Sequence, residues 1–216
     1  MNNKKFSLIV LALVGILAFT GYSCSKGGGG KSGGSGPNLT EQGEKAEAVD
    51  LGLTVKWASC NIGANKPEEE GTYFCWGDST GKGKMIDATD NTPKEISGTG
   101  MDIARVMYGG NWRMPTQIEI QEFVTQCKFS LVTQGGKKII KAIGPTGNFI
   151  LLPLSGESNG GTSKSYEGDD AEFMSGTYKP ESRGIVTFSC DTTLFYHESS
   201  VGIIGDVRLV VRPVTK

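Results

Sequence analysis

The first 36 residues determine how much of this chain is available to build a fold. A short basic start, with Lys4 and Lys5, is followed by an uncharged run of about fourteen residues at 6–19. Cys24 comes soon after, and a stretch rich in glycine, serine and lysine extends to Pro37. This order is the layout of a bacterial lipoprotein export signal. We therefore expect residues 1–23 to be a signal peptide and residues 24–48 to be a tether outside the fold.

The apolar run is too short for a permanent membrane helix, because crossing the hydrocarbon core of ~30 Å takes roughly twenty residues. We expect lipidation at Cys24, with several acyl chains giving a stable anchor. The alternative is an ordinary secretory signal that leaves Cys24 as a thiol. Ser25, in place of aspartate, favours the outer membrane of the cell envelope. The sequence leaves open whether the domain faces the periplasm or the cell surface.

Charge and length exclude some classes of function. The chain of 216 residues has a formal net charge of −1, which argues against binding nucleic acid. Residues 49–216 are enough for one domain with its own core. The 32 glycines indicate many turns and short strands rather than a helical bundle.

Four cysteines lie in the expected domain, at Cys60, Cys75, Cys127 and Cys190. An exported protein can form disulfides, and four cysteines allow three full pairings. Buried free thiols are the alternative. No Cys-x-x-Cys motif is present and His197 is the single histidine, so an ordinary zinc site is not expected.

The pattern of apolar residues predicts an α+β fold. Residues 49–57 alternate apolar and polar side chains, which is typical of a strand with one buried face. Thr116 and Glu119 form a capping box ahead of an amphipathic helix at 117–127, and a short helix is expected at 102–108. Further strands are expected at 71–76, 129–133, 137–143, 148–154, 184–189 and 207–214, with long loops at 77–100 and 155–172.

Four strings of residues carry a resemblance to a known family. They are 49–63 (VDLGLTVKWASCNIG), 67–77 (PEEEGTYFCWG), 110–116 (GNWRMPT) with Glu119, and 211–214 (VRPV). Their order and spacing resemble the Fibrobacter succinogenes major paralogous domain family of envelope lipoproteins. The resemblance implies a C-type lectin-like fold in 49–216, with two helices, paired N- and C-terminal strands, and long loops that carry any ligand site. One departure is residues 173–177 (FMSGT), where the family usually has a tryptophan.

The candidate ligand-binding residues fall in two loops. Trp76 and Asp78 stand at a loop entrance, where an indole face could stack on a sugar. Long loops on a rigid scaffold often carry function. The 155–172 loop contributes the remaining candidates, which are Glu157, Asn159, Tyr166, Asp169 and Asp170. These oxygens leave calcium open as an alternative ligand, although the EF-hand spacing is absent and we assign no metal site.

These observations favour a non-catalytic lipoprotein that binds a glycan or an envelope or host surface protein through its loops. The alternative is a structural or assembly subunit of an envelope or adhesive complex. No catalytic residues are assigned, because one histidine and no nucleophile motif give little support for an enzyme. No cofactor is expected. The Trp112-Arg113 pair before the capped helix is read as structural.

Overall fold

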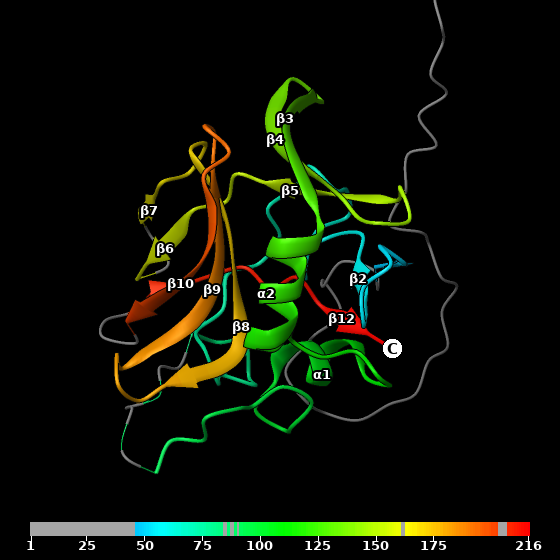
Figure 1. The fold of residues 1–216 in the computed structure, drawn as a ribbon. Helices are drawn as coiled ribbons and strands as arrows, with labels where there is room; N and C mark the ends of the chain where they lie inside the picture. Colours follow the sequence, from blue (N-terminus) through cyan, green and yellow to red (C-terminus); the bar gives the residue numbers. More distant parts are fainter. Residues whose placement is uncertain (1–45, 84–85, 87–88, 90, 161–162, 203–206) are drawn as a thin grey trace, which may run out of the picture.

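A computed structural model describes residues 46–216, except 84–85, 87–88, 90, 161–162 and 203–206. The predicted signal peptide, Cys24 and nearly all of the tether lie outside the described residues. Within them the chain forms two helices and four small antiparallel sheets (Figure 1). This confirms the α+β class. Neither helix in the described ranges is long and apolar enough to cross a membrane.

The two ends of the domain meet in one sheet. β1 (Ala48–Val49), β2 (Lys56–Ala58) and β12 (Val214–Thr215) lie in the order β1-β2-β12. Val214 pairs with Trp57 across the β12–β2 ladder. The expected pairing of N- and C-terminal strands is therefore present.

The continuous strand expected at 49–57 is wrong, because the chain reverses within it. Gly52 has a φ of 82°, a conformation that favours glycine, and its amide donates to Asp50 Oδ1 at 2.9 Å. The apolar side chains are nevertheless buried as predicted, with Leu51 and Trp57 at 0% exposure. The alternation identified the buried residues but not the turn.

Both predicted helices are present. α1 (Ile103–Tyr108) begins after Asp102, whose carboxylate accepts from the amides of Ala104 and Arg105. α2 (Gln117–Gln126) carries the predicted capping box between Thr116 and Glu119. In Figure 1, α2 lies against the sheet that contains β8 and β9.

The three strands after α2 also match the expectation. β3 (Lys128–Gln134), β4 (Lys137–Ile143) and β5 (Phe149–Pro153) form an antiparallel sheet in that order. The tip of the β3–β4 hairpin extends beyond the end of α2 in Figure 1.

The second half of the chain contains more strand than predicted. The loop expected at 155–172 is wrong, because β6 (Glu157–Asn159) and β7 (Ser163–Ser165) form a hairpin there, and β11 (Val207–Arg208) pairs with β6. β8 (Asp170–Lys179), β9 (Gly184–Asp191) and β10 (Tyr196–Gly202) form another sheet. The strand expected at 71–76 is reduced to one bridge, between Phe74 and Leu209.

Aromatic rings fill the main core between α2 and the sheets. The Phe123 ring of α2 lies 4.5 Å from that of Trp57 and 5.4 Å from that of Phe188. Phe173 and Phe188 stack at 4.8 Å between ring centroids. Cys75, Cys127 and Cys190 are buried thiols that form no disulfide, which matches the second alternative for these three. Cys60 is disulfide-bonded, which matches the first alternative for that residue.

A fully buried arginine connects the core to the loops. The Arg212 guanidinium donates to Asn61 Oδ1 at 2.8 Å and to the carbonyls of Ala58 at 3.0 Å and Leu151 at 2.8 Å. Burial lowers the pKa of Arg212 to about 9, so the side chain stays charged at neutral pH. One side chain thus holds β2, β5 and the loop after β2 together.

Candidate functional site

The first two candidate residues lie in the protein interior. Trp76 is 3% exposed, packs beside Tyr178 at 5.8 Å, and donates through Nε1 to the Ser175 carbonyl at 3.1 Å. Asp78 is 4% exposed and accepts from the Thr80 amide at 2.9 Å. Neither side chain offers a face for stacking on a ligand, so the predicted role of Trp76 and Asp78 does not fit their burial.

The other five candidates gather around the β6–β7 hairpin and the start of β8. Asn159 on β6 donates to Ser165 Oγ at 3.2 Å, and Glu157 lies two residues before it on the same strand. The Tyr166 carbonyl accepts from the amides of Asp169 and Asp170 at 3.0 Å each.

Tyr166 stands out in this group because its side chain is 60% exposed. Among the described residues, no group of three or more His, Cys, Asp or Glu side chains is placed to hold a metal ion.

A cavity of about 310 Å³ opens beside this group, where the turn after β7 approaches the tip of the β3–β4 hairpin. We call it the tip pocket. Three segments that are distant in sequence supply its charged groups, and Pro153 and Leu154 at the end of β5 supply apolar surface. The lining residues are Glu68, Glu70, Lys137, Lys138, Pro153, Leu154, Glu167 and Gly168.

A bonded group of side chains builds one wall of the tip pocket. Lys164 forms ion pairs with Glu70 and with Glu167, the latter at 2.9 Å. The Tyr73 hydroxyl contacts Glu70 Oε2 at 2.9 Å and the Ser155 carbonyl at 2.6 Å. Burial and the charge of Glu70 raise the pKa of Tyr73, so its phenol stays protonated as a donor. This wall is therefore held in place before any ligand arrives.

The opposite wall comes from the hairpin tip. Gln134 donates through Nε2 to Glu68 Oε2 at 3.2 Å, which ties the tip to the 67–70 segment. Gly135 and Gly136 make the turn with φ of 58° and 78°, and the exposed Lys137 and Lys138 follow directly. Carboxylate acceptors and ammonium donors therefore face one cavity from different elements. Such a set can bind hydroxyl groups, but it contains no nucleophile beside a base.

Sequence reasoning missed most of the tip pocket. Glu68 and Glu70 lie within a string that served only to identify the resemblance, and Lys137 and Lys138 lie within an expected strand. The paired glycines before two lysines, at residues 135–138, were the available signal for an exposed turn with free cations. Nothing in the sequence showed that this turn meets the 67–70 segment.

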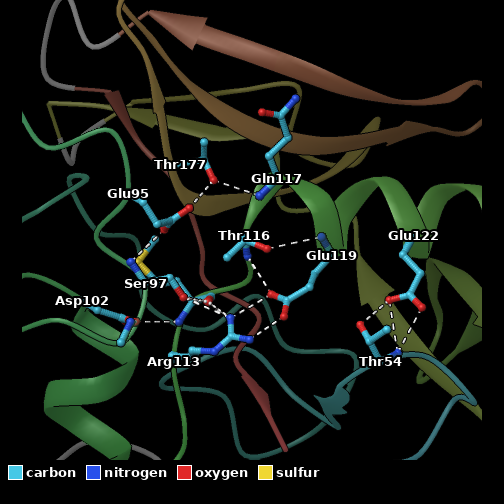
Figure 2. A network of polar contacts seen from close by, with 12 residues as sticks. Thr54, Glu95, Ser97, Asp102, Arg113, Thr116, Gln117, Glu119, Glu122 and Thr177 are labelled. Atoms are coloured by element: carbon cyan, nitrogen blue, oxygen red, sulfur yellow. Dashed lines mark hydrogen bonds and ion pairs between the residues drawn. The ribbon is translucent and has the colours of Figure 1, made fainter.

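The Trp112-Arg113 region is structural, as expected. Arg113 pairs with Glu119 of the capping box and donates to Ser97 Oγ at 3.0 Å (Figure 2). The buried Asp102 carboxylate accepts from the Met114 amide at 2.8 Å. Figure 2 shows these bonds joining the loop before α1, the start of α1 and the start of α2. They fix the two helices relative to each other.

No family model matches the chain, and no curated protein or solved structure matches it significantly. The residues of the tip pocket therefore provide the basis for a functional argument.

Proposed function

We propose that this chain is a non-catalytic lipoprotein of the cell envelope whose domain binds a glycan in the tip pocket. The observation that carries the proposal is the pocket itself, a cavity of about 310 Å³ with fixed acceptors and donors on opposite walls. Cavities of roughly 300–1,000 Å³ with a few placed polar groups are typical of small-ligand sites. A glycan presents vicinal hydroxyls that can donate to Glu68 and accept from Lys137 or Lys138.

The charges of the pocket favour a neutral sugar at this site. Glu70 and Glu167 are already paired with Lys164, which leaves Glu68 facing Lys137 and Lys138. The exposed ring of Tyr166 precedes Glu167 in the chain, and an aromatic ring at the edge of a pocket can stack on the C–H face of a sugar. The carboxylates paired with Lys164 and the ring of Tyr166 would give selectivity for a neutral sugar, and the apolar surface of the pocket would give the contact area.

The wider assignment rests on the sequence and on the coarse architecture. Lipidation at Cys24 would tether the domain to the outer membrane, on the periplasmic or the surface face, through the glycine- and serine-rich stretch that follows. We further propose a C-type lectin-like domain of the Fibrobacter succinogenes major paralogous type. The paired terminal strands, two helices and long connections support this proposal. We propose no bound cofactor, with calcium as a variable in the test.

A glycan array probed with the purified protein, with and without calcium, tests the proposal. Saturable binding to a neutral glycan class should fall at least about tenfold in Glu68→Gln and in Lys138→Gln, because each removes one charged partner. The control Glu181→Gln removes an exposed carboxylate from the turn between β8 and β9 and should bind like the original protein. Equal binding by all four proteins would reject the tip pocket as the site.

A protein partner is the second candidate. Phe195 is 64% exposed and Tyr196 is 39% exposed at the start of β10, and two neighbouring exposed rings are typical of a protein contact. An envelope or host protein, or other subunits of an adhesive complex, would then bind here. A blank glycan array with folded protein, followed by a specific partner lost in Phe195→Ser, would support this alternative.

A further inference from the structure

The β3–β4 hairpin concentrates positive charge. Residues 128–143 contain four lysines and no acidic residue, in a chain whose formal net charge is −1. The four are Lys128, Lys137, Lys138 and Lys141. The hairpin extends beyond α2 (Figure 1), and Lys128, Lys137 and Lys138 are exposed while Lys141 is half-buried.

The strand register places three of these lysines on one face. Lys128 pairs with Ile143, Lys141 with Ser130, and Lys137 with Gln134. Residues directly opposite share a face, and every second residue along a strand returns to that face. Lys128, Lys141 and Lys137 therefore lie on the same side of the sheet.

The other side of this sheet is the one that packs in the core. Ile140 and Ala142 belong to the main apolar cluster, and Phe129 packs against it. Lys138 lies on that side, near the tip. The face with three lysines is thus the face directed away from that cluster, and Ile139 and Leu151, which share this face, are themselves buried at 1% and 5% exposure.

A second cavity of about 300 Å³ lies on this outward face, and we call it the face pocket. Val132 and Leu151 give it apolar surface, and Lys141 gives it an ammonium group. The Lys141 Nζ atom sits 3.9 Å from the centroid of the Phe149 ring. The complete lining is Val132, Thr133, Gln134, Lys141 and Leu151.

We propose that the outward face of β3–β4–β5 is a second binding site, specific for an acidic oligosaccharide. The apolar floor of the face pocket contacts one sugar ring, while the lysines along the strands pair with carboxylate or sulfate groups of the same chain. Lys137 faces Gln134, the sixth residue after Lys128, so the row spans about 20 Å, enough for several sugar units. Within the described residues, neither Lys128 nor Lys137 forms an ion pair.

The concave shape favours an oligosaccharide over an anionic membrane surface. A bilayer contacts a protein over a wide, nearly flat surface and cannot enter a cavity of about 300 Å³, whereas a sugar ring can. The face pocket is distinct from the tip pocket, although Gln134 lines one and bonds to Glu68 of the other, and Lys137 belongs both to the lysine row and to the lining of the tip pocket. The two sites therefore need separate variants.

The test is calorimetric titration of the purified protein with an oligogalacturonate and with its neutral methyl ester. We expect saturable binding of the acidic form, weakened by added salt, and at least tenfold weaker binding of the ester. Lys128→Gln/Lys141→Gln should weaken oligogalacturonate binding by about tenfold, since two ion pairs are lost. Lys128→Arg/Lys141→Arg keeps both positive charges and should bind oligogalacturonate like the original protein. The matched control, Lys56→Gln/Lys94→Gln, removes the same charge from exposed positions elsewhere and should change the affinity less than twofold.

A further variant separates the site from the general charge of the hairpin. Val132→Glu puts a carboxylate into the half-buried face pocket and should abolish binding, with the fold checked by its thermal transition. Equal losses in the control and the site variant would overturn the proposal, as would equal affinity for acid and ester. Binding of phosphatidylglycerol vesicles without binding of oligogalacturonate would overturn it in favour of a membrane contact. The neutral-glycan array tests the tip pocket alone. A blank array therefore leaves the calorimetric test of the outward face unaffected.

Discussion

Glu172 on β8 should make this domain less stable as the pH rises. Its side chain is 7% exposed, and burial is the main cause that raises the pKa from 4.5 to about 7. The nearby charges of Glu157 and Asp170 raise it further, while a contact with Thr187 opposes them. The native protein therefore holds a proton on Glu172 over a range of pH in which the unfolded chain has released it.

The sign and size of the effect follow from this difference. The folded pKa lies above the unfolded value, so the contribution of Glu172 is fully present below about pH 4.5 and is lost as the pH rises through about 7. A separation of about 2.5 pKa units corresponds to a loss of about 3 kcal/mol in the free energy of unfolding. Glu172→Gln keeps the shape of the side chain and removes the titration.

Urea denaturation at a series of pH values measures the prediction directly. The difference in unfolding free energy between Glu172→Gln and the original protein should move in favour of the variant by about 3 kcal/mol between about pH 4.5 and 8. Glu181→Gln makes the same substitution at an exposed turn and is the matched control for the change of side chain.

Other groups, such as Glu119 with its lowered pKa, also make the unfolding free energy depend on pH. Their contributions are the same in both proteins and cancel in the difference. If the curves of Glu172→Gln and the original protein stay parallel across this range, the carboxyl is ionised in the native state and the reasoning fails. A variant that loses stability relative to the original protein as the pH rises would contradict it as well.

Three further predictions test the buried polar groups and thiols. Arg212→Ala should lower the unfolding free energy by about 3 kcal/mol or more in denaturant titrations, because three buried acceptors lose their donor. A loss of less than about 1 kcal/mol would contradict this prediction. Thr116→Ala removes the side-chain half of the capping box and should cost about 1 kcal/mol by the same assay. Burial raises the pKa of Cys127 and of Cys190 to about 12, so both thiols should stay unreactive toward a disulfide reagent until the protein unfolds.

The parts of the fold that could be predicted are those whose signals are local. The capping box at Thr116 and the apolar face of α2 are complete within about eleven residues, and the structure keeps both. The prediction at 137–143 matched β4 because its turn and its partners β3 and β5 are adjacent in the chain. Sequence periodicity reports such elements well because no distant partner is needed to form them.

β8 could not be predicted because both of its faces are buried. Ala171 and Phe173 point into the main core, while Glu172 and Met174, on the other side, are buried as well. A strand buried on two sides loses the alternation of apolar and polar residues. The 155–172 region failed for a related reason, since its short strands gain their partner, β11, from the far end of the chain.

The candidate site shows the same contrast between features that local sequence predicts and features that depend on distant contacts. The sequence identified the polar segment that contains Tyr166 and Asp170, but burial removed Trp76 and Asp78, which looked equally accessible in the linear chain. The tip pocket requires the 67–70 segment to lie beside the β3–β4 turn. That approach is made by single contacts, such as that of Gln134 with Glu68, which no spacing in the sequence records.

Buried polar contacts, rather than regular structure, hold the tip pocket in shape. Glu68 and Glu70 lie in a stretch without helix or strand, yet the Asn61 side chain donates to the Glu70 carbonyl at 2.8 Å and is itself bonded by the buried Arg212. The Tyr73 hydroxyl joins this stretch to the Ser155 carbonyl, immediately before the β6–β7 hairpin. Leaving a buried hydrogen-bonding group without a partner costs more free energy than a formed hydrogen bond contributes. The 67–70 stretch therefore has few alternative positions. The chain can therefore present a preformed pocket from loops, which is what binding without a large ordering cost requires.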